Sequence, residues 1–404
     1  MAVLPVRNAT QQAAFLELPR ELYAGDPNWV GPLDMELRAL FNPNKNPHFA
    51  EGEAQWWIAQ DRKGRVLGRI ASFIYYPKAH RYAVPTGGMG FFECIEDYSV
   101  AADLISTAQA WLAERGMEAA DAFVNFGEND RFWGVLIEGF DSPPAYGMPY
   151  NKPYYADFLT RYGFELYFQQ ESRELRLSEI PERIARIAQR AAQKEGVEFA
   201  YPDLHNLYKY AMDFRTIYND AWQFHEHFVP LSENRVIRLV ESLKPILIPE
   251  LIYFAYVGGE PAGIILAIPD LNQIFRPWRG KPTLFQLLTF LWRKRNRYAW
   301  YRKHGILTKL RVMLMGVRPK FQRRGLESAL AYLPVPPVIQ MGFTHAELSW
   351  VGDFNPAMLA VLEATQARRS RIHATFRYYF TAEARSRAIR KRHIIDMHAP
   401  LSGR

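Results

Sequence analysis

The residues with the clearest chemical meaning form one turn between Val317 and Glu327, with the sequence Val-Arg-Pro-Lys-Phe-Gln-Arg-Arg-Gly-Leu-Glu. The turn follows an extended apolar run and precedes a run with helical spacing. Backbone N–H groups at such a strand-to-helix turn point outwards together and bind anions such as a pyrophosphate. Arg323 and Arg324 add charge-assisted donors, and Gly325 leaves the backbone open to close approach. A solvated basic turn is the alternative interpretation.

The elements that must position this turn alternate between strands and helices. Extended stretches at 308–317 and 344–350 flank a helical segment at 326–333, and a hairpin at 251–269 precedes them. The N-terminal half repeats this order, so the sequence predicts two copies of one topology with a junction near Ser178. The expected fold class is α/β or α+β, with two mixed, twisted sheets flanked by helices.

The remaining elements are predicted from hydrophobic periodicity and turn residues. In the N-terminal half we expect strands at 2–6, 55–60, 66–76, 90–95, 120–125 and 164–177 and helices at 10–23, 100–115 and 154–162. In the C-terminal half we expect further strands at 197–201 and 372–380 and further helices at 203–222, 232–243 and 356–365.

Composition places the 404 residues among folded globular proteins, with 49% hydrophobic and 23% charged residues. The single cysteine, Cys94, excludes a disulfide framework or a cysteine-built zinc site within the monomer and favours a reducing compartment. The histidines show no metal-ligand spacing, and no metal is predicted. The sequence contains neither a signal-peptide pattern nor an apolar run long enough to span a bilayer. We therefore expect a cytoplasmic protein, soluble or peripheral at the inner face of the membrane.

The net charge of +8 is concentrated in one segment. Between Leu271 and Leu326 there are 15 Lys or Arg residues and no Asp or Glu, which leaves 35 basic and 42 acidic residues elsewhere. Such a segment is expected to meet something anionic.

Within this segment, the apolar stretch Leu284–Trp292 precedes a basic stretch, Arg293–Arg297, and then three aromatic residues. This is the composition of a helix that lies at a membrane surface. We therefore predict peripheral contact of residues 284–301 with anionic membrane. A helix buried between the two units is the alternative. Nucleic acid is the least favoured partner, because the aromatic residues lie in a hydrophobic run instead of a stacking pattern.

Two motifs carry a family resemblance. The pattern Val-x-Pro-x-Phe-Gln-x-x-Gly at 317–325 resembles motif A of the GNAT superfamily, the acyl-CoA N-acyltransferases. The sequence Glu-Leu-Ser-Trp-Val-Gly-Asp-Phe-Asn at 347–355, followed by a helix and Arg377-Tyr-Tyr-Phe380, resembles the second motif of that family, a splayed strand before an Asn-started helix. Phrases at 90–95, 125–130 and 150–155 resemble a bacterial branch with two GNAT-like units in tandem, so the resemblance covers nearly the whole chain.

The resemblance implies an acyl-CoA-dependent N-acyltransferase that transfers an acyl group to an amine. It implies a site for coenzyme A built from Gly316, Val317, Gln322, Arg323, Arg324, Gly325, Leu326 and Asn355. For catalysis it implies Glu347 as general base, Asp353 as second carboxylate, and Tyr378 or Tyr379 as proton donor to the leaving thiolate. The alternative, structural roles are a surface ion pair for Glu347, a helix cap for Asp353, and packing for Tyr378 and Tyr379.

The resemblance also implies the division of the chain. Residues 1–178 would form a degenerate unit that does not bind coenzyme A, and residues 179–404 the binding unit, with a basic and aromatic insertion at 271–307. Two departures from the family pattern stand out: Glu327 where Gly or Ala is preferred, and Leu362 where many members have a catalytic tyrosine. An amphiphilic acceptor resembling a sphingoid base is the favoured substrate. A non-catalytic tandem GNAT protein that binds a membrane surface or a partner is the alternative.

Overall fold

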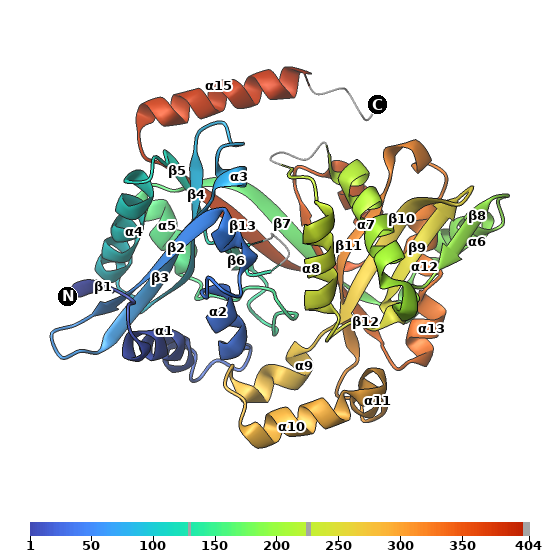
Figure 1. The fold of residues 1–404 in the computed structure, drawn as a ribbon, viewed down its shortest axis with the longest axis horizontal. Helices are drawn as coiled ribbons and strands as arrows, with labels where there is room; N and C mark the ends of the chain where they lie inside the picture. Colours follow the sequence, from blue (N-terminus) through green and yellow to red (C-terminus); the bar gives the residue numbers. More distant parts are fainter. Residues whose placement is uncertain (128–130, 224–227, 399–404) are drawn as a thin grey trace. The chain divides into compact units, whose positions relative to one another are not determined.

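The structure is a computed structural model that describes residues 1–127, 131–223 and 228–398. The chain forms two compact units, each discontinuous in sequence (Figure 1). Unit 1 comprises Met1–Gln169, Trp278–Lys281 and Ile372–Arg404, and unit 2 comprises Gln170–Pro277 and Pro282–Arg371. Each unit contains a mixed sheet flanked by helices, which confirms the predicted fold class. Residues 128–130 of the phrase at 125–130 lie outside the described residues.

Unit 1 is built from short helices and a sheet of mostly antiparallel strands. Its elements are β1 (Ala2–Pro5), α1 (Ala9–Leu22), α2 (Asp34–Leu40), β2 (Gly52–Gln60), β3 (Val66–Tyr75), α3 (Tyr76–Ala79), β4 (Thr86–Cys94), α4 (Tyr98–Ala113), β5 (Ala119–Ala122), β6 (Val135–Glu138), α5 (Tyr155–Tyr162), the start of β7 (Glu165–Arg176), most of β13 (Arg368–Tyr379) and α15 (Ala382–His398).

The sheet of unit 1 follows the order β1-β2-β3-β4-β5-β13. Only β4 and β5 are parallel in this row, and the connection between them is the helix α4. Parallel neighbours need such a crossover, so the pairing follows from the predicted strand-helix-strand order. Leu104, Ile105 and Leu112 of α4 are fully buried against strand residues such as Ile70 and Met89.

Unit 2 repeats this plan and adds helices between its strands. Its elements are the end of β7, α6 (Glu182–Ala192), β8 (Val197–Ala200), α7 (Leu207–Trp222), α8 (Glu233–Leu243), β9 (Ile252–Val257), β10 (Glu260–Pro269), α9 (Asn272–Phe275), α10 (Leu284–Arg293), α11 (Arg295–Lys303), β11 (Lys309–Val317), α12 (Leu326–Tyr332), α13 (Val335–Gln340), β12 (His345–Gly352), α14 (Pro356–Ala364) and the start of β13.

The sheet of unit 2 follows the order β7-β12-β11-β10-β9-β8, and its single parallel pair is β11 with β12, joined through α12. Helices cover both faces of β11. Val317 packs into a core with Phe321, Leu326 and Leu330 on the α12 side, whereas the Cα of its neighbour Gly316 faces the α7 side. Alternation of side chains along the strand produces these two environments.

The two units exchange their last strands. The strand β7 follows the elements of unit 1 in sequence, yet its residues from Gln170 onward pair with β12 of unit 2. Conversely, β13 follows the elements of unit 2, and its residues from Phe376 to Tyr379 pair with β5 of unit 1. The compact units therefore differ from the contiguous segments 1–178 and 179–404 expected from the repeat.

Candidate active site

The parallel pair β11 and β12 stays together over only four residues. Their register runs from Lys309 with His345 to Val312 with Leu348. Beyond this point β11 continues beside β10, and β12 continues beside β7 to Gly352. The strands therefore separate, and residues 313–317 and 349–352 face each other without pairing. We call these two stretches the β11–β12 divergence.

Backbone direction decides which groups of β11 face the divergence. The N–H of Arg318 donates to the carbonyl of Ala262 in β10, at 2.8 Å. Because backbone groups alternate along a strand, Gly316 also turns towards β10, whereas Val317 and Met315 turn towards the divergence. Of the two residues expected to offer amides to a ligand, Val317 thus faces the divergence and Gly316 does not.

Gly316 has a packing role. A Cβ at this position would lie 2.4 Å from ring atoms of Trp222, at the end of α7. The absence of a side chain lets the indole lie directly on the strand.

The basic loop, residues 318–325, joins β11 to α12. The amide Nε2 of Gln322 donates to the carbonyl of Val317 at 3.1 Å and closes the turn. The side chains of Arg323 and Arg324 are exposed, and neither forms an ion pair with the rest of the described chain. Arg324 lies over the ring of Phe321, with 5.6 Å to the centroid. The loop therefore presents two uncompensated cations beside the end of β11.

Gly325 lets the basic loop pack closely against α6. Its φ of +84° is a left-handed conformation that disfavours other residues. A Cβ there would lie 3.2 Å from Ile187 and 3.3 Å from Ala191, both on α6. The ammonium of Lys194, just after α6, donates to the carbonyl of Arg324 at 3.0 Å. The helix α6 was not predicted from the sequence, although Ile184, Ala188 and Ala191 have helical spacing and are buried.

The residues after the glycine divide between core and surface. The side chain of Leu326 is 1% exposed in the core beside α12, so only its backbone is available to a ligand. Glu327 is half-buried and forms no ion pair with Arg323 or Arg324 in the described structure.

Glu347 lies on β12, two residues before the divergence, opposite Arg311 in the strand register. Its side chain is buried and its Oε1 accepts hydrogen bonds from Arg371 Nη1 at 2.9 Å and Ser370 Oγ at 3.2 Å. Both donors bind Oε1, so Oε2 is the carboxylate oxygen without a hydrogen-bond partner among the described residues. A carboxylate held on one oxygen and open on the other suits a general base.

Two buried arginines accompany this carboxylate, and neither was predicted from the sequence to have a role. Arg311 is 1% exposed and donates through Nε to Ser349 Oγ at 2.8 Å, and Arg371 is 4% exposed. Arginine is rarely buried without a partner. An isolated arginine within the apolar run Leu310-Arg-Val312 was therefore the available signal.

The residues that follow β12 have more ordinary roles. Asp353 is exposed in the turn between β12 and α14. Asn355 caps α14, because its side chain accepts a hydrogen bond from the N–H of Met358 at 3.1 Å. Leu362, at the position expected for a catalytic tyrosine, is buried in α14.

Tyr378 and Tyr379 lie in the part of β13 that belongs to unit 1. They pair with Ala120 and Ala119 of β5. The ring of Tyr378 packs at 5.3 Å from the rings of Tyr162 and Phe164. The structure therefore packs both tyrosines, partly buried, against the core of unit 1, whereas Glu347 belongs to unit 2.

Unit 1 contains the same strand arrangement with different surroundings. Its parallel pair ends at Met89 with Ala122, and Cys94 stands five residues further along β4, as Val317 does along β11. The N–H of Cys94 donates to the hydroxyl of Tyr155 at 2.9 Å, and its carbonyl accepts from Tyr154 at 2.8 Å. The loop to the next helix is residues 95–97, compared with 318–325 in unit 2. Tyrosine hydroxyls thus occupy both the N–H and the carbonyl of Cys94, whereas in unit 2 the side-chain amide of Gln322 binds the carbonyl of Val317.

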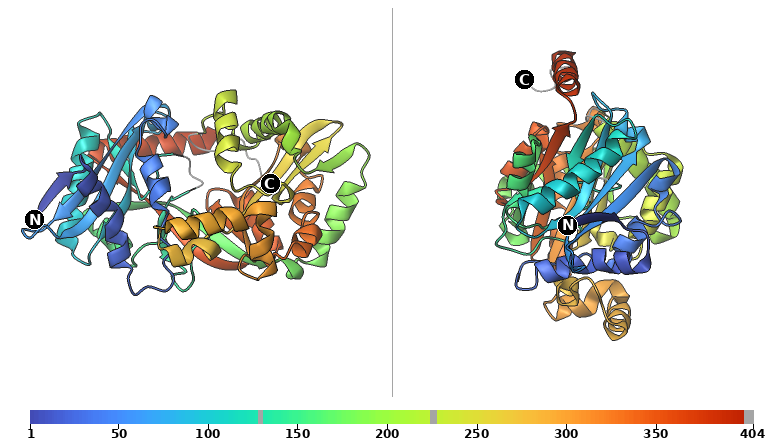
Figure 2. Two further views of the ribbon diagram at one scale, coloured as in Figure 1. Left: turned by 60° about the horizontal axis from the view of Figure 1, so that its bottom comes forward. Right: turned by 90° about the vertical axis from the view of Figure 1, so that its left-hand side faces the viewer.

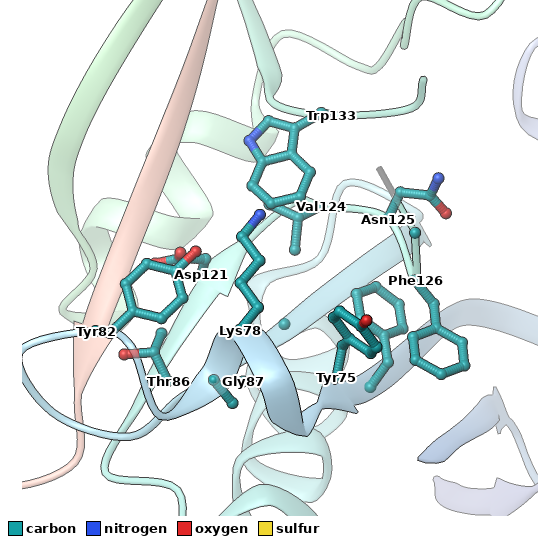
Figure 3. Close-up of a pocket in the computed structure, with 14 residues that line it drawn as sticks. Tyr75, Lys78, Tyr82, Thr86, Gly87, Asp121, Val124, Asn125, Phe126 and Trp133 are labelled. Atoms are coloured by element: carbon teal, nitrogen blue, oxygen red, sulfur yellow. The ribbon is translucent and has the colours of Figure 1, made fainter. Parts of the chain in front are cut away.

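Unit 1 contains a small pocket whose lining includes Lys78, Asp121 and Trp133 (Figure 3). Figure 3 shows Lys78 reaching towards Trp133, and its ammonium lies 4.4 Å from the ring centroid. Asp121 in the wall is bound by Arg377 through two hydrogen bonds of 2.6 and 2.8 Å.

The comparisons with known proteins place these features in a family. No protein-family model matches the chain. Over 375 residues the chain is 30% identical to the "Bacterial ceramide synthase" of Caulobacter vibrioides. The alignment covers 90% of this chain and 93% of that relative.

Two solved structures show the fold. A tandem GNAT protein from the clavulanic acid biosynthesis pathway superposes with a TM-score of 0.56 at 13% identity, over 94% of this chain and 98% of that one. A fungal β-N-acetylglucosaminidase with a GCN5-related glucosamine N-acetyltransferase region gives a TM-score of 0.58 at 12% identity, over 93% of this chain and 38% of that one. The resemblance to tandem GNAT proteins is thereby confirmed. The chain belongs to the family of the bacterial ceramide synthase and is a GNAT-type N-acyltransferase.

Proposed function

We propose that the protein transfers an acyl group from a coenzyme A thioester to the amine of an amphiphilic acceptor, such as a sphingoid base. The observation that carries this proposal is the β11–β12 divergence, which opens strand groups of unit 2 next to an uncompensated basic loop. The name of the ceramide synthase relative supports a lipid-like amine as acceptor.

The divergence and the loop suit the two ends of an acyl-CoA. The pantetheine arm carries amides, and the N–H of Val317 and the backbone groups of Met315 are placed to bond them as a neighbouring strand would. The pyrophosphate carries negative charge, which the guanidinium groups of Arg323 and Arg324 attract. The thioester then lies towards the apex of the divergence, where Glu347 stands.

The proposed reaction needs one proton acceptor. The ammonium of the acceptor loses a proton to Oε2 of Glu347, and the freed lone pair attacks the thioester carbonyl carbon. The carbon–sulfur bond breaks, the second proton of the attacking nitrogen passes to the departing thiolate, and Glu347 releases its proton to solvent. The products are an amide and the thiol of coenzyme A. Arg371 and Ser370 fix the carboxylate by holding Oε1. Fixing the base in this way lowers the entropic cost of the attack.

We propose that unit 1 does not bind coenzyme A. Its loop lacks the basic residues, and Tyr154 and Tyr155 already bond the backbone of Cys94. The segment 150–155 then has a structural role, because its tyrosines block the part of unit 1 that corresponds to the proposed coenzyme A site of unit 2.

A mass-spectrometric assay tests the activity. The purified protein is incubated with acetyl-CoA or palmitoyl-CoA and with either sphinganine or a small polar amine. We expect an amide of sphinganine and release of the coenzyme A thiol. The absence of amide with every donor and acceptor pair would overturn the proposed function, and product only with the polar amine would overturn the acceptor class.

Coenzyme A binding is tested at the loop. The double variant Arg323→Gln with Arg324→Gln removes two exposed cations that form no ion pair within the described chain. Two exposed charge contacts contribute about 1–2 kcal/mol together, so we expect coenzyme A affinity by calorimetry to fall about 5- to 30-fold. The matched control, Arg183→Gln with Arg238→Gln, makes the same change in net charge on α6 and α8 and should bind as the parent does. Equal affinities for the two double variants would contradict the loop assignment.

A further inference from the structure

The helix α10 exposes a continuous apolar face. Five of its ten residues are large, apolar and more than two fifths exposed: Leu284 at 73%, Phe285 at 78%, Leu288 at 56%, Leu291 at 43% and Trp292 at 61%. At 100° per residue these five positions fall within about a third of the helix circumference. We call them the α10 ridge. The helix α10 is labelled in Figure 1 and drawn in orange in both views of Figure 2.

The opposite side of α10 is firmly attached to unit 2. Phe290 is 8% exposed and packs against Phe275, with ring centroids 5.2 Å apart, and against Tyr301. A capping box between Thr283 and Gln286 fixes the start of the helix. These contacts fix the orientation of α10, so that the α10 ridge faces away from unit 2.

Such a surface indicates a binding partner. Soluble monomers rarely expose contiguous apolar patches of this kind, because each exposed Leu or Phe side chain loses the free energy of burial. The protein therefore gains by covering the α10 ridge.

The charges around the ridge specify the partner. The segment 271–326 contains no acidic residue, and Lys281 and Arg295, which bracket α10, are exposed and form no ion pair in the described structure. Other cations nearby are committed within the fold: Arg297 is paired with Glu250, and Arg293 stacks on Trp300 at 3.6 Å from the centroid. The cations of the basic stretch Arg293–Arg297 therefore differ in their availability to a partner, because Arg297 and Arg293 already bind other residues of the fold.

The geometry fits a bilayer surface. No helix in the described residues has the length and apolarity needed to cross a membrane. A ten-residue helix with an apolar face and basic ends lies in the plane of the interface, with Leu, Phe and Trp among the headgroups and acyl chains. Lysine and arginine at its ends then meet lipid phosphates.

We propose that the α10 ridge docks unit 2 on an anionic lipid surface. The proposal concerns where the protein binds and is independent of the acyl transfer, because vesicle binding is measured without substrates. A docked α10 would also give unit 2 access to acceptors that reside in the membrane.

Sedimentation with vesicles tests the proposal. The parent should sediment with vesicles of phosphatidylcholine and phosphatidylglycerol, bind vesicles of phosphatidylcholine alone more weakly, and be released by salt. The variant Leu284→Ser with Leu288→Ser should bind the anionic vesicles at least about tenfold more weakly. Its thermal transition should be unchanged, because both side chains are exposed.

Matched controls separate the ridge from general effects. Leu166→Ser with Leu204→Ser removes two leucines of similar exposure, 51% and 50%, outside α10 and should bind as the parent does. Lys281→Gln with Arg295→Gln should weaken binding to anionic vesicles only. A parent that ignores both kinds of vesicle would overturn the proposal. A parent that dimerises through the ridge without binding lipid, seen in sedimentation equilibrium, would overturn it in favour of a second copy of the chain.

Discussion

Replacing Glu347 by Gln separates the chemical role of this carboxylate from its structural one. The substitution keeps the shape of the side chain and removes the charge opposite Arg371. Both side chains are buried, at 7% and 4% exposure. Breaking a buried ion pair costs about 3–5 kcal/mol, because the remaining charge is left uncompensated. We therefore expect a clear fall in the melting temperature of Glu347→Gln.

The effect on turnover should be larger than stability alone explains. Losing a general base lowers the rate by about two to four orders of magnitude. The matched variant Arg371→Gln breaks the same pair from the other side and keeps the carboxylate. It should lose similar stability and much less turnover, when both variants are assayed well below their melting temperatures.

The pH profile supplies the refuting result. Without a base, the reaction depends on acceptor amine that is already deprotonated, so the turnover of Glu347→Gln should rise with pH more steeply than that of the parent. Turnover is measured as released coenzyme A thiol, and stability by calorimetry. A loss below about threefold, or an equal loss for both variants at every pH, would assign Glu347 to structure alone.

Three further predictions follow from the geometry. Gly325→Val should lower the free energy of unfolding by about 1–3 kcal/mol, because the left-handed backbone and the contact with Ile187 exclude a branched side chain; an unchanged denaturant midpoint would contradict this. Gly316→Ala should weaken the packing of Trp222 and shift its fluorescence, and an emission spectrum identical to the parent's would show that the indole does not rest on β11. Burial raises the pKa of the Cys94 thiol to about 12, so it should resist Ellman's reagent near neutral pH until denaturant is added; rapid labelling of the native protein would show that the thiol is accessible.

The elements that sequence predicted well are those with local signals. The hairpin of β2 and β3 turns at Asp61-Arg-Lys-Gly64, and α5 ends at Gly163 with a left-handed φ of +112°. Alternation and turn residues specify such elements without reference to the rest of the chain. The same local signals located the basic loop and its flanking strand and helix.

Features that depend on contacts between residues far apart in the chain could not be predicted from the sequence. The strands β7 and β13, which the units exchange, lie about 200 residues apart in the sequence. The periodicity of each strand predicts which face is buried but not which strand it pairs with. Glu347 was predicted as a base, but its pairing with Arg371 depends on strand order. The role of Tyr154 and Tyr155 in closing the first copy appears only when β4 is placed beside α5.

Photoaffinity mapping tests the central claim most directly. The protein is irradiated with an acyl-CoA that carries a diazirine on its acyl chain, with and without excess coenzyme A, and labelled peptides are sequenced. We expect labels that excess coenzyme A suppresses on the β11–β12 divergence, at residues 313–317 and 349–352. Suppressible labels confined to β4 and β5 of unit 1 would contradict the assignment of acyl-CoA binding to unit 2.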